Sequence, residues 1–137
     1  MQLLDHVSIG VPDIDQARPF YDAVMAALGA AKVYDRPAAV GYGERCNAND
    51  TASTFLAVYL DPAEVRASKR HWCFKAASRE HVHAFFDAGV AAGGRSDGEP
   101  GLRPHYHEHY YAAFLVDPAG NRIEAVCNAA APTPERA

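Results

Sequence analysis

The chain has 137 residues, of which 49% are hydrophobic and 22% are charged, with a formal net charge of −4 at pH 7, and it therefore predicts one soluble globular domain. An acidic balance without a basic stripe argues against nucleic acid as a partner, and no apolar run approaches the ~20 residues that cross a membrane. An N-terminus unlike a signal peptide and three cysteines without a CxxC motif make the reducing cytoplasm the expected location.

The first half of the chain predicts a strand, a helix and further strands. Residues 3–11 are rich in branched apolar residues, which is typical of a strand. Asp13, followed three residues later by a glutamine, forms a capping-box pattern, and apolar residues then recur at helical spacing until Gly29. Pro19 removes one backbone donor, so the helix either has an irregular first turn or begins at Asp15. The segments AAVGYGE and STFLAVYL predict the strands that follow.

The second half repeats this pattern. The segment HWCFKA predicts a strand, Ser78 is a helix cap, and a buried helical stripe runs on to Gly93 and Gly94. Two strands, HYYAAFLV and NRIEAV, then follow, joined by a tight turn at residues 117–120.

An internal repeat relates the two halves without a gap, at a shift of 71 − 6 = 65 residues. The matched pairs are His6 with His71, Phe20 with Phe85, Tyr21 with Phe86, Asp22 with Asp87, and Gly29 with Gly94. We therefore predict an α+β fold in which a single domain, residues 1–128, contains two βαβββ units. The expected parts are unit one at 2–60, a linker at 61–70, unit two at 71–128 and a flexible tail at 129–137.

The same shift places Tyr59 opposite Glu124, so that His6, Tyr59, His71 and Glu124 become equivalent positions. Two imidazoles and one carboxylate, with coordination positions left open, are a ligand set for a divalent catalytic metal. A lone histidine is more often a satisfied, half-buried side chain. That interpretation weakens when two histidines share one position of a repeat.

Three segments, DHVSIG from Asp5, HWCF from His71 and YAAFLVDPAGNRIE from Tyr111, resemble the vicinal oxygen chelate superfamily over residues 2–128. This superfamily includes glyoxalase I, extradiol dioxygenases, fosfomycin resistance thiol transferases and bleomycin resistance proteins. The resemblance implies a cup-shaped, partly barrel-like mixed sheet with helices outside. It also implies an enzyme that chelates neighbouring substrate oxygens on one divalent metal ion (Zn, Ni, Mn or Fe(II)) held by residues matching His6, His71 and Glu124.

Departures from each branch leave the reaction open between isomerase or lyase chemistry, thiol transfer and dioxygenation. Tyr59 stands where glyoxalase I-like sites have a carboxylate, so we expect it to be a candidate catalytic residue that does not bind the metal, and the conventional glyoxalase I reaction should be absent or weak. Phe114 stands where dioxygenases have tyrosine. Fosfomycin-type enzymes need a basic cluster, and the candidates here are scattered: Arg45, Lys75, Arg95 and Arg103. The alternative is a non-catalytic small-molecule binding protein of the bleomycin-resistance type, although such proteins lack the metal ligands.

Three alternating histidines lie in the segment PHYHEHYY, residues 104–111. If the turn at 117–120 makes a two- or four-residue hairpin loop, odd-numbered side chains share a face with Glu124, whereas a bulge at Gly120 would reverse this. The first arrangement brings to the cavity the candidate catalytic residues His107, His109 and Tyr111.

Two other interpretations of this segment remain open. It is either a solvent loop or, less favourably, a separate metal ribbon on His105, His107 and His109, which lacks a carboxylate. Cys73, two residues after His71 on one strand, should face the same side as that histidine. The partners expected for the whole chain are a small-molecule substrate and, because a curled sheet leaves open edges, a second copy in a homodimer.

Overall fold

The computed structural model describes residues 3–62 and 70–132, and within them the chain forms two βαβββ units. Unit one contains β1 (His6–Val11), α1 (Ile14–Ala27), β2 (Lys32–Arg36), β3 (Ala39–Gly43) and β4 (Phe55–Leu60). Unit two contains β5 (His71–Lys75), α2 (Arg79–Ala91), β6 (Arg95–Leu102), β7 (Tyr111–Val116) and β8 (Arg122–Cys127). The predicted α+β fold is confirmed. Most of the predicted linker, 63–69, and the end of the predicted tail, 133–137, lie outside the described residues.

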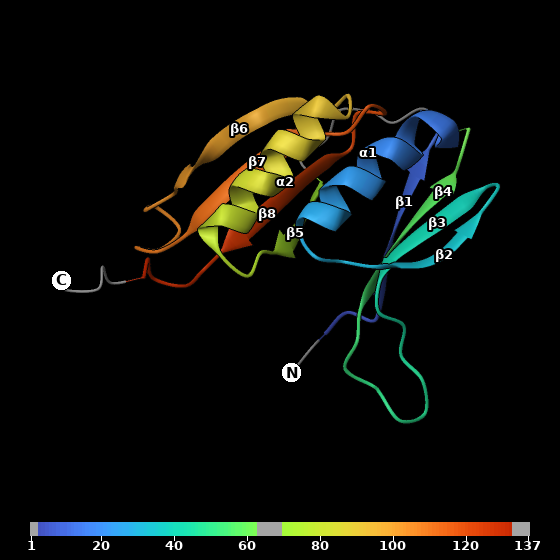
Figure 1. Ribbon diagram of the computed structural model, residues 1–137, viewed down its shortest axis with the longest axis horizontal. Helices are drawn as coiled ribbons and strands as arrows, with labels where there is room; N and C mark the ends of the chain where they lie inside the picture. The colour runs from blue at the N-terminus through green and yellow to red at the C-terminus, as the bar shows by residue number, and fades with distance from the viewer. Residues whose placement is uncertain (1–2, 63–69, 133–137) are drawn as a thin grey trace.

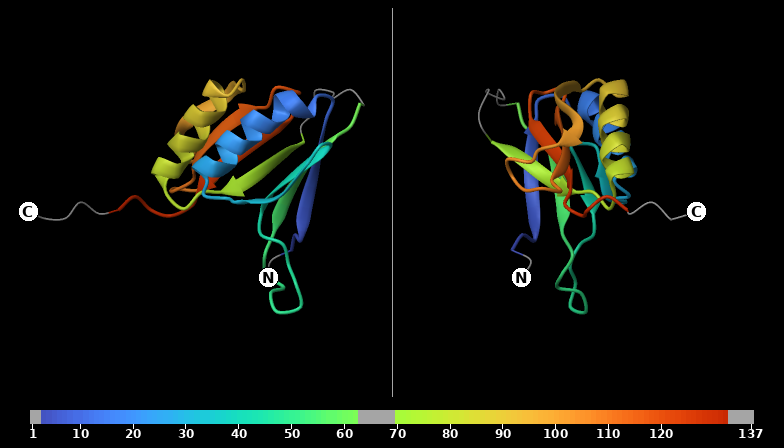
Figure 2. Two further views of the ribbon diagram at one scale, coloured as in Figure 1. Left: turned by 45° about the vertical axis from the view of Figure 1, so that its right-hand side comes forward. Right: turned by 90° about the vertical axis from the view of Figure 1, so that its left-hand side faces the viewer.

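Each unit forms a four-stranded mixed sheet with the same topology, β1-β4-β3-β2 in unit one and β5-β8-β7-β6 in unit two. The first strand of each sheet pairs in parallel with the last strand, and the other neighbours pair antiparallel. Figure 1 shows both helices on one side of the two sheets, and the turned views in Figure 2 show the opposite side without helices. The sheets do not close into barrels, which is consistent with a cup.

Both helices begin and end at the predicted signals. Asp13 accepts a hydrogen bond from the backbone N–H of Gln16 at 3.0 Å, and Ser78 accepts one from His81 at 3.2 Å. Gly29 follows α1 with a φ of 79°, a conformation that other residues rarely adopt. Pro19 lies inside α1, which begins at Ile14, so the alternative in which the helix starts at Asp15 is wrong.

The sequence patterns missed one strand in each unit. The predicted βαβββ unit requires three strands after each helix, but only two were located in the sequence, and the third is β2 (KVYDR) in unit one and β6 (RSDGEPGL) in unit two. Both lie at the outer edge of their sheet, where one row of backbone groups faces solvent and polar residues are tolerated. Their apolar alternation is therefore too weak to identify them from composition.

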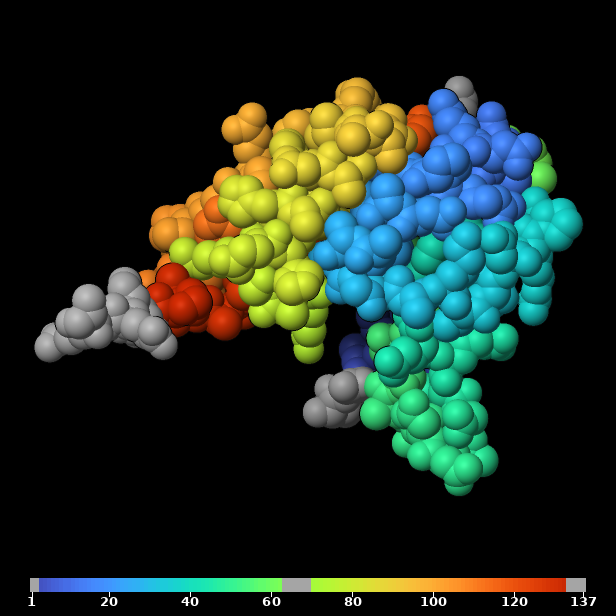
Figure 3. Space-filling model, in the orientation of Figure 1, coloured from blue at the N-terminus to red at the C-terminus, as the bar shows by residue number. Residues whose placement is uncertain are grey.

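The two units share one hydrophobic core beneath the paired helices, which lie side by side in Figure 3. Gly89 allows this close approach, because a Cβ there would lie 2.3 Å from Leu115 Cδ1 and 3.0 Å from Val24 Cγ1. Buried Asp117 adds a polar link between the units, since it accepts a hydrogen bond from the Tyr21 hydroxyl at 2.6 Å. The units are therefore fixed to each other through α1, α2 and the turn before β8.

Candidate functional site

His71 and Glu124 come together on the helix-free face of unit two. The β5–β8 register places Cys73 beside Glu124, and His71 extends over it so that His71 Nε2 lies 3.1 Å from Glu124 Oε1. The carboxylate belongs to a residue that is only 2% exposed, whereas the His71 side chain is 47% exposed. A buried carboxylate with an accessible imidazole beside it is thus available from one chain.

Two further polar side chains surround this carboxylate. The Tyr110 hydroxyl donates a hydrogen bond to Glu124 Oε2, and burial followed by this bond raises the pKa of Tyr110 well above its ordinary value. Cys73 is exposed as a residue at the sheet edge, but its thiol interacts with Tyr110 and Glu124. Burial of this thiol, followed by the negative charge of Glu124, raises the pKa of Cys73 to about 12. Both groups therefore stay protonated at neutral pH and bring no charge of their own. Cys73 faces the same side as His71, as predicted.

A pocket of ≈ 440 Å³ opens over the same face. Its walls come from β5, β6, β7, β8 and the β6–β7 connection, and the lining residues are His71, Asp97, Gly98, Arg103, His105, Tyr106, Phe114 and Arg122. Sequence patterns identified neither Arg122 nor Tyr110 as site residues. The signal that could have found them is strand register, because Arg122 lies two residues before Glu124 on β8 and Tyr110 immediately precedes β7.

Of the two orientations left open for the histidine-rich segment, the one that puts odd-numbered side chains on the Glu124 face is wrong. Phe114 pairs with Glu124 and Val116 pairs with Arg122, so residues 117–121 form a five-residue connection and even-numbered side chains share the Glu124 face. Asp117 favours this longer turn, because its Oδ1 accepts hydrogen bonds from two backbone N–H groups within it. Tyr110, rather than Tyr111, consequently reaches the carboxylate.

The predicted catalytic residues of this segment have other partners. The Tyr111 hydroxyl lies 2.6 Å from His83 Nε2 on the helix side of the sheet. His107 Nε2 lies 2.8 Å from Asn128 Oδ1, and His107 Nδ1 accepts a hydrogen bond from the backbone N–H of His109. The structure does not bring these three side chains to Glu124, and a catalytic role for them stays a prediction.

The predicted equivalence of Tyr59 and Glu124 is also wrong, by two residues. Ser8 of β1 and Cys73 of β5 are matched by the 65-residue shift. Ser8 pairs with Ala57 in unit one, and Cys73 pairs with Glu124 in unit two. The counterpart of Glu124 is therefore Ala57, at a shift of 124 − 57 = 67, because the connections between the later strands differ in length between the units. Tyr59 pairs with Gly10 instead and is 40% exposed.

His6 occupies the position on β1 that His71 occupies on β5. Its Nδ1 lies 2.7 Å from Asp5 Oδ1, and its ring stacks on Phe55 with 4.9 Å between centroids. The hydrogen bond from His6 lowers the pKa of Asp5. Throughout residues 3–62 and 70–132, no three His, Cys, Asp or Glu side chains are grouped as a metal site, so a single chain does not join His6 to His71 and Glu124.

The donor atoms of His71 and Glu124 fit a divalent cation. Two ligand atoms each about 2.1 Å from one ion lie roughly 3.0–3.4 Å apart at octahedral or tetrahedral angles. The 3.1 Å between His71 Nε2 and Glu124 Oε1 falls within this interval. An imidazole nitrogen with a carboxylate oxygen is also a donor set that such ions prefer.

The fold defines a class of proteins built from paired βαβββ units with a helix-free, cup-like face. The sequence profile described as Glyoxalase/Bleomycin resistance protein/Dioxygenase superfamily matches residues 3–125. The chain belongs to this superfamily. A search of curated proteins finds no match. Among the described residues, no helix combines the length and apolar character needed to cross a membrane.

Solved structures agree with this assignment. A glyoxalase/bleomycin resistance protein from Albidiferax ferrireducens T118 is 30% identical, with 90% of this chain and 96% of that chain covered and a TM-score of 0.73. A glyoxalase/bleomycin resistance protein/dioxygenase family enzyme from Burkholderia phytofirmans PsJN is 20% identical, with 91% and 98% covered and a TM-score of 0.67. A lactoylglutathione lyase from Agrobacterium tumefaciens is 19% identical, with 92% and 93% covered and a TM-score of 0.59. The last two show a shared fold alone.

Proposed function

We propose that this protein is a metal-dependent enzyme that binds two neighbouring oxygens of a small substrate on one divalent ion, Zn, Ni, Mn or Fe(II). The observation that carries the proposal is the 3.1 Å approach of His71 Nε2 to the buried Glu124 Oε1, at the wall of a pocket of ≈ 440 Å³. A buried carboxylate whose neighbours are an imidazole and the neutral hydroxyl of Tyr110 is a favourable place for a cation.

His6 completes the site from a second copy of the chain in this proposal. Asp5 accepts the Nδ1 hydrogen of His6, which leaves Nε2 free as a donor atom, as is usual for metal-binding histidines. Apolar side chains are exposed at the edge strands β1 and β5, one in each sheet. Leu3 and Leu4 precede β1, and Trp72 lies on β5. In the homodimer that we propose, these side chains are covered and His6 of the partner subunit joins His71 and Glu124.

The metal would act as a Lewis acid that polarises the bound substrate oxygens. His71 and Glu124 would hold it, while Tyr110 fixes the carboxylate through Oε2 and leaves Oε1 toward His71. Because its pKa is raised, Tyr110 is a proton donor at neutral pH rather than a base. Tyr110 thereby takes the place proposed above for Tyr111.

The counterpart of Glu124 in unit one is Ala57, which supplies neither a fourth ligand nor a base. Glyoxalase I-like isomerisation depends on a carboxylate at that position. We therefore propose that the conventional glyoxalase I reaction is weak or absent, and that the enzyme catalyses a reaction for which three protein ligands on the metal are enough.

Metal analysis after anaerobic purification tests the proposal. We expect one divalent ion per chain, which His71→Ala should lose. The control variant His83→Ala changes an exposed histidine of α2 and should retain the metal. A substrate panel of α-oxoaldehyde–thiol adducts, catechols and epoxides would then identify the reaction. A protein that binds members of the panel without metal and without turnover would instead be a binding protein of the bleomycin-resistance type.

Mixed dimers test the shared site directly. His6→Ala and Glu124→Gln chains should each bind little metal alone. Co-expressed, they should regain part of it, because one site of each mixed dimer has His71 and Glu124 from one chain and His6 from the other. No recovery in a verified mixed dimer would contradict a site shared between subunits.

A further inference from the structure

The pocket beside His71 has a positive charge balance although the chain as a whole carries −4. Its lining includes two arginines, Arg103 and Arg122, and one carboxylate, Asp97. Neither arginine is engaged in a close ion pair in the described structure, since the nearest carboxylate contact is 3.9 Å from Arg122 Nε to Asp97 Oδ2. This balance favours an anionic ligand.

Arg103 is held in place by β6, the strand that ends at the residue before it. Its Nη1 donates to the Gly101 carbonyl at 2.9 Å and its Nη2 to the Glu99 carbonyl at 2.7 Å, while the guanidinium lies 5.4 Å from the centroid of the Phe114 ring. These two bonds use two of the five guanidinium N–H donors. The remaining donors are oriented before any ligand arrives, which lowers the entropic cost of binding.

Arg122 is placed by the same register that places the metal-ligand candidates. It pairs with His71 across the β5–β8 ladder and lies two residues before Glu124, so the three side chains share one face. The Arg122 side chain is about half exposed, and among the described residues its one carboxylate contact is the long one with Asp97. It is therefore free to form charge-assisted hydrogen bonds with a ligand.

The apolar part of the pocket is aromatic. Phe114 lies opposite Glu124 on β7, with its ring 6.5 Å from that of His71, and Tyr106 contributes a largely exposed ring to the lining. Flat faces beside planar guanidinium groups suit a planar ligand body.

We propose that the substrate is a small planar organic anion whose oxyanion group, a carboxylate or a phosphonate, binds Arg103 and Arg122. This inference rests on the proposed function, because the same pocket wall presents His71 to the neighbouring oxygens of the substrate. The arginines set specificity, and their contribution to binding does not require the metal.

Matched simple probes test the inference without turnover. Benzoate, phenylphosphonate and the neutral benzamide would be titrated calorimetrically against EDTA-treated and metal-loaded protein. We expect at least one anion to bind about tenfold or more tightly than benzamide in both forms, and more weakly as salt is added. The preference between benzoate and phenylphosphonate identifies the oxyanion.

Arginine variants assign the effect. Arg122→Gln should weaken anion binding about tenfold or more, while Arg95→Gln, on the same strand as the pocket wall but outside the lining, should leave it within about twofold. Arg103→Lys keeps the charge and should bind the anion more weakly than the wild type because the fork is lost. If the Arg103 variants do not fold, the anion affinity of Arg122→Gln still tests the inference.

Equal binding of benzamide and both anions, no anion binding at millimolar concentration, or unchanged binding in Arg122→Gln would each overturn the inference. Metal content measured on the same samples separates it from the proposed function. Retained metal without anion selectivity refutes the substrate class alone, whereas anion selectivity in a chain that never binds metal refutes the metal enzyme and leaves the anion site.

Discussion

The two βαβββ units have the same strand order and helix position, yet their helix-free faces differ. Unit one carries His6 and Ala57 where unit two carries His71 and Glu124. The first strand and the helix keep the gapless 65-residue repeat, whereas the last strand, which carries Glu124 in unit two, does not. The two units therefore share the topology of the fold. The difference between Ala57 and Glu124 at one buried strand position decides which unit supplies the carboxylate.

The surface above these strands differs as well. Gly41 of β3 pairs with Ala57, as Phe114 of β7 pairs with Glu124. The Tyr34 ring occupies the space over Gly41, since a Cβ there would lie 2.5 Å from Tyr34 Cε1. Unit one thus fills its own face with an aromatic ring, whereas unit two leaves a pocket.

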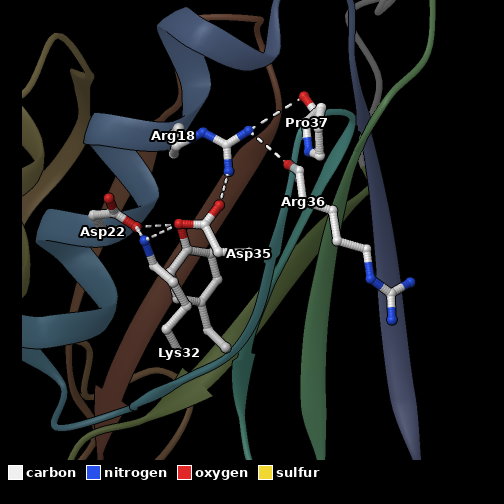
Figure 4. A network of polar contacts seen from close by, with 7 residues as sticks. Arg18, Asp22, Lys32, Asp35, Arg36 and Pro37 are labelled. Carbon is white, nitrogen blue, oxygen red and sulfur yellow. Dashed lines mark hydrogen bonds and ion pairs between the residues drawn. The ribbon is translucent and has the colours of Figure 1, made fainter.

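The edge strands are held in different ways. Lys32 and Asp35 of β2 join an ion-pair network with Arg18 and Asp22 of α1, and Arg18 Nη2 also donates to the Arg36 carbonyl at 2.9 Å (Figure 4). Polar residues in a strand thus have a structural use here. On β6, Arg103 just beyond the strand bonds back to two of its carbonyls instead.

The largest expected effect concerns the carboxylate itself. If Glu124 binds the metal as proposed, Glu124→Gln should reduce metal affinity by at least about 100-fold, because the charge of the proposed ligand is lost. Its counterpart variant in unit one, Ala57→Ser, should retain the metal. Elemental analysis and competition with a chelator measure both, and equal loss in the two variants would contradict the asymmetry.

Tyr110→Phe should weaken metal binding by about 10- to 100-fold, because the group that orients Glu124 is removed. The matched control is Tyr111→Phe, in which the adjacent hydroxyl on the opposite face is lost. If Tyr111→Phe has the larger effect, the register assigned to β7 is wrong.

Tyr21→Phe makes unit one resemble unit two, which has Phe86 at the matched position. The free energy of unfolding should fall by about 1–2 kcal/mol, because the change removes one of the hydrogen bonds to buried Asp117. Chemical denaturation measures the loss. Tyr106→Phe, at an exposed position, is the control and should be neutral.

The smallest effect is expected for Asp35→Asn at the edge of unit one. The hydrogen bond from Lys32 lowers the pKa of Asp35, so the carboxylate stabilises the fold above its ordinary pKa and this stabilisation is lost as the pH falls through the lowered value. The variant should melt slightly below the wild type at pH 7 in low salt, and the difference should shrink in high salt or acid. Asp87→Asn in unit two is the control, and a difference that persists in acid would argue against a charge effect.

The sequence by itself determined the scaffold and half of the site. The repeat predicted two βαβββ units, Asp13 and Ser78 predicted the helix starts, and the structure places His71 with Glu124. These features are readable because caps and apolar periodicity act within a few residues, and because a strand fixes which side chains share a face.

Only the tertiary structure decided the rest. The β7–β8 turn is one residue longer than a four-residue loop, and this difference places Tyr110 rather than Tyr111 at the carboxylate. Connections of different length in the two units make Ala57, rather than Tyr59, the counterpart of Glu124. Arg103 and Arg122, 19 residues apart (122 − 103) in sequence, meet in one pocket only after β6, β7 and β8 pair. Register and loop length are set by long-range packing, and a gapless comparison of the repeats does not contain them.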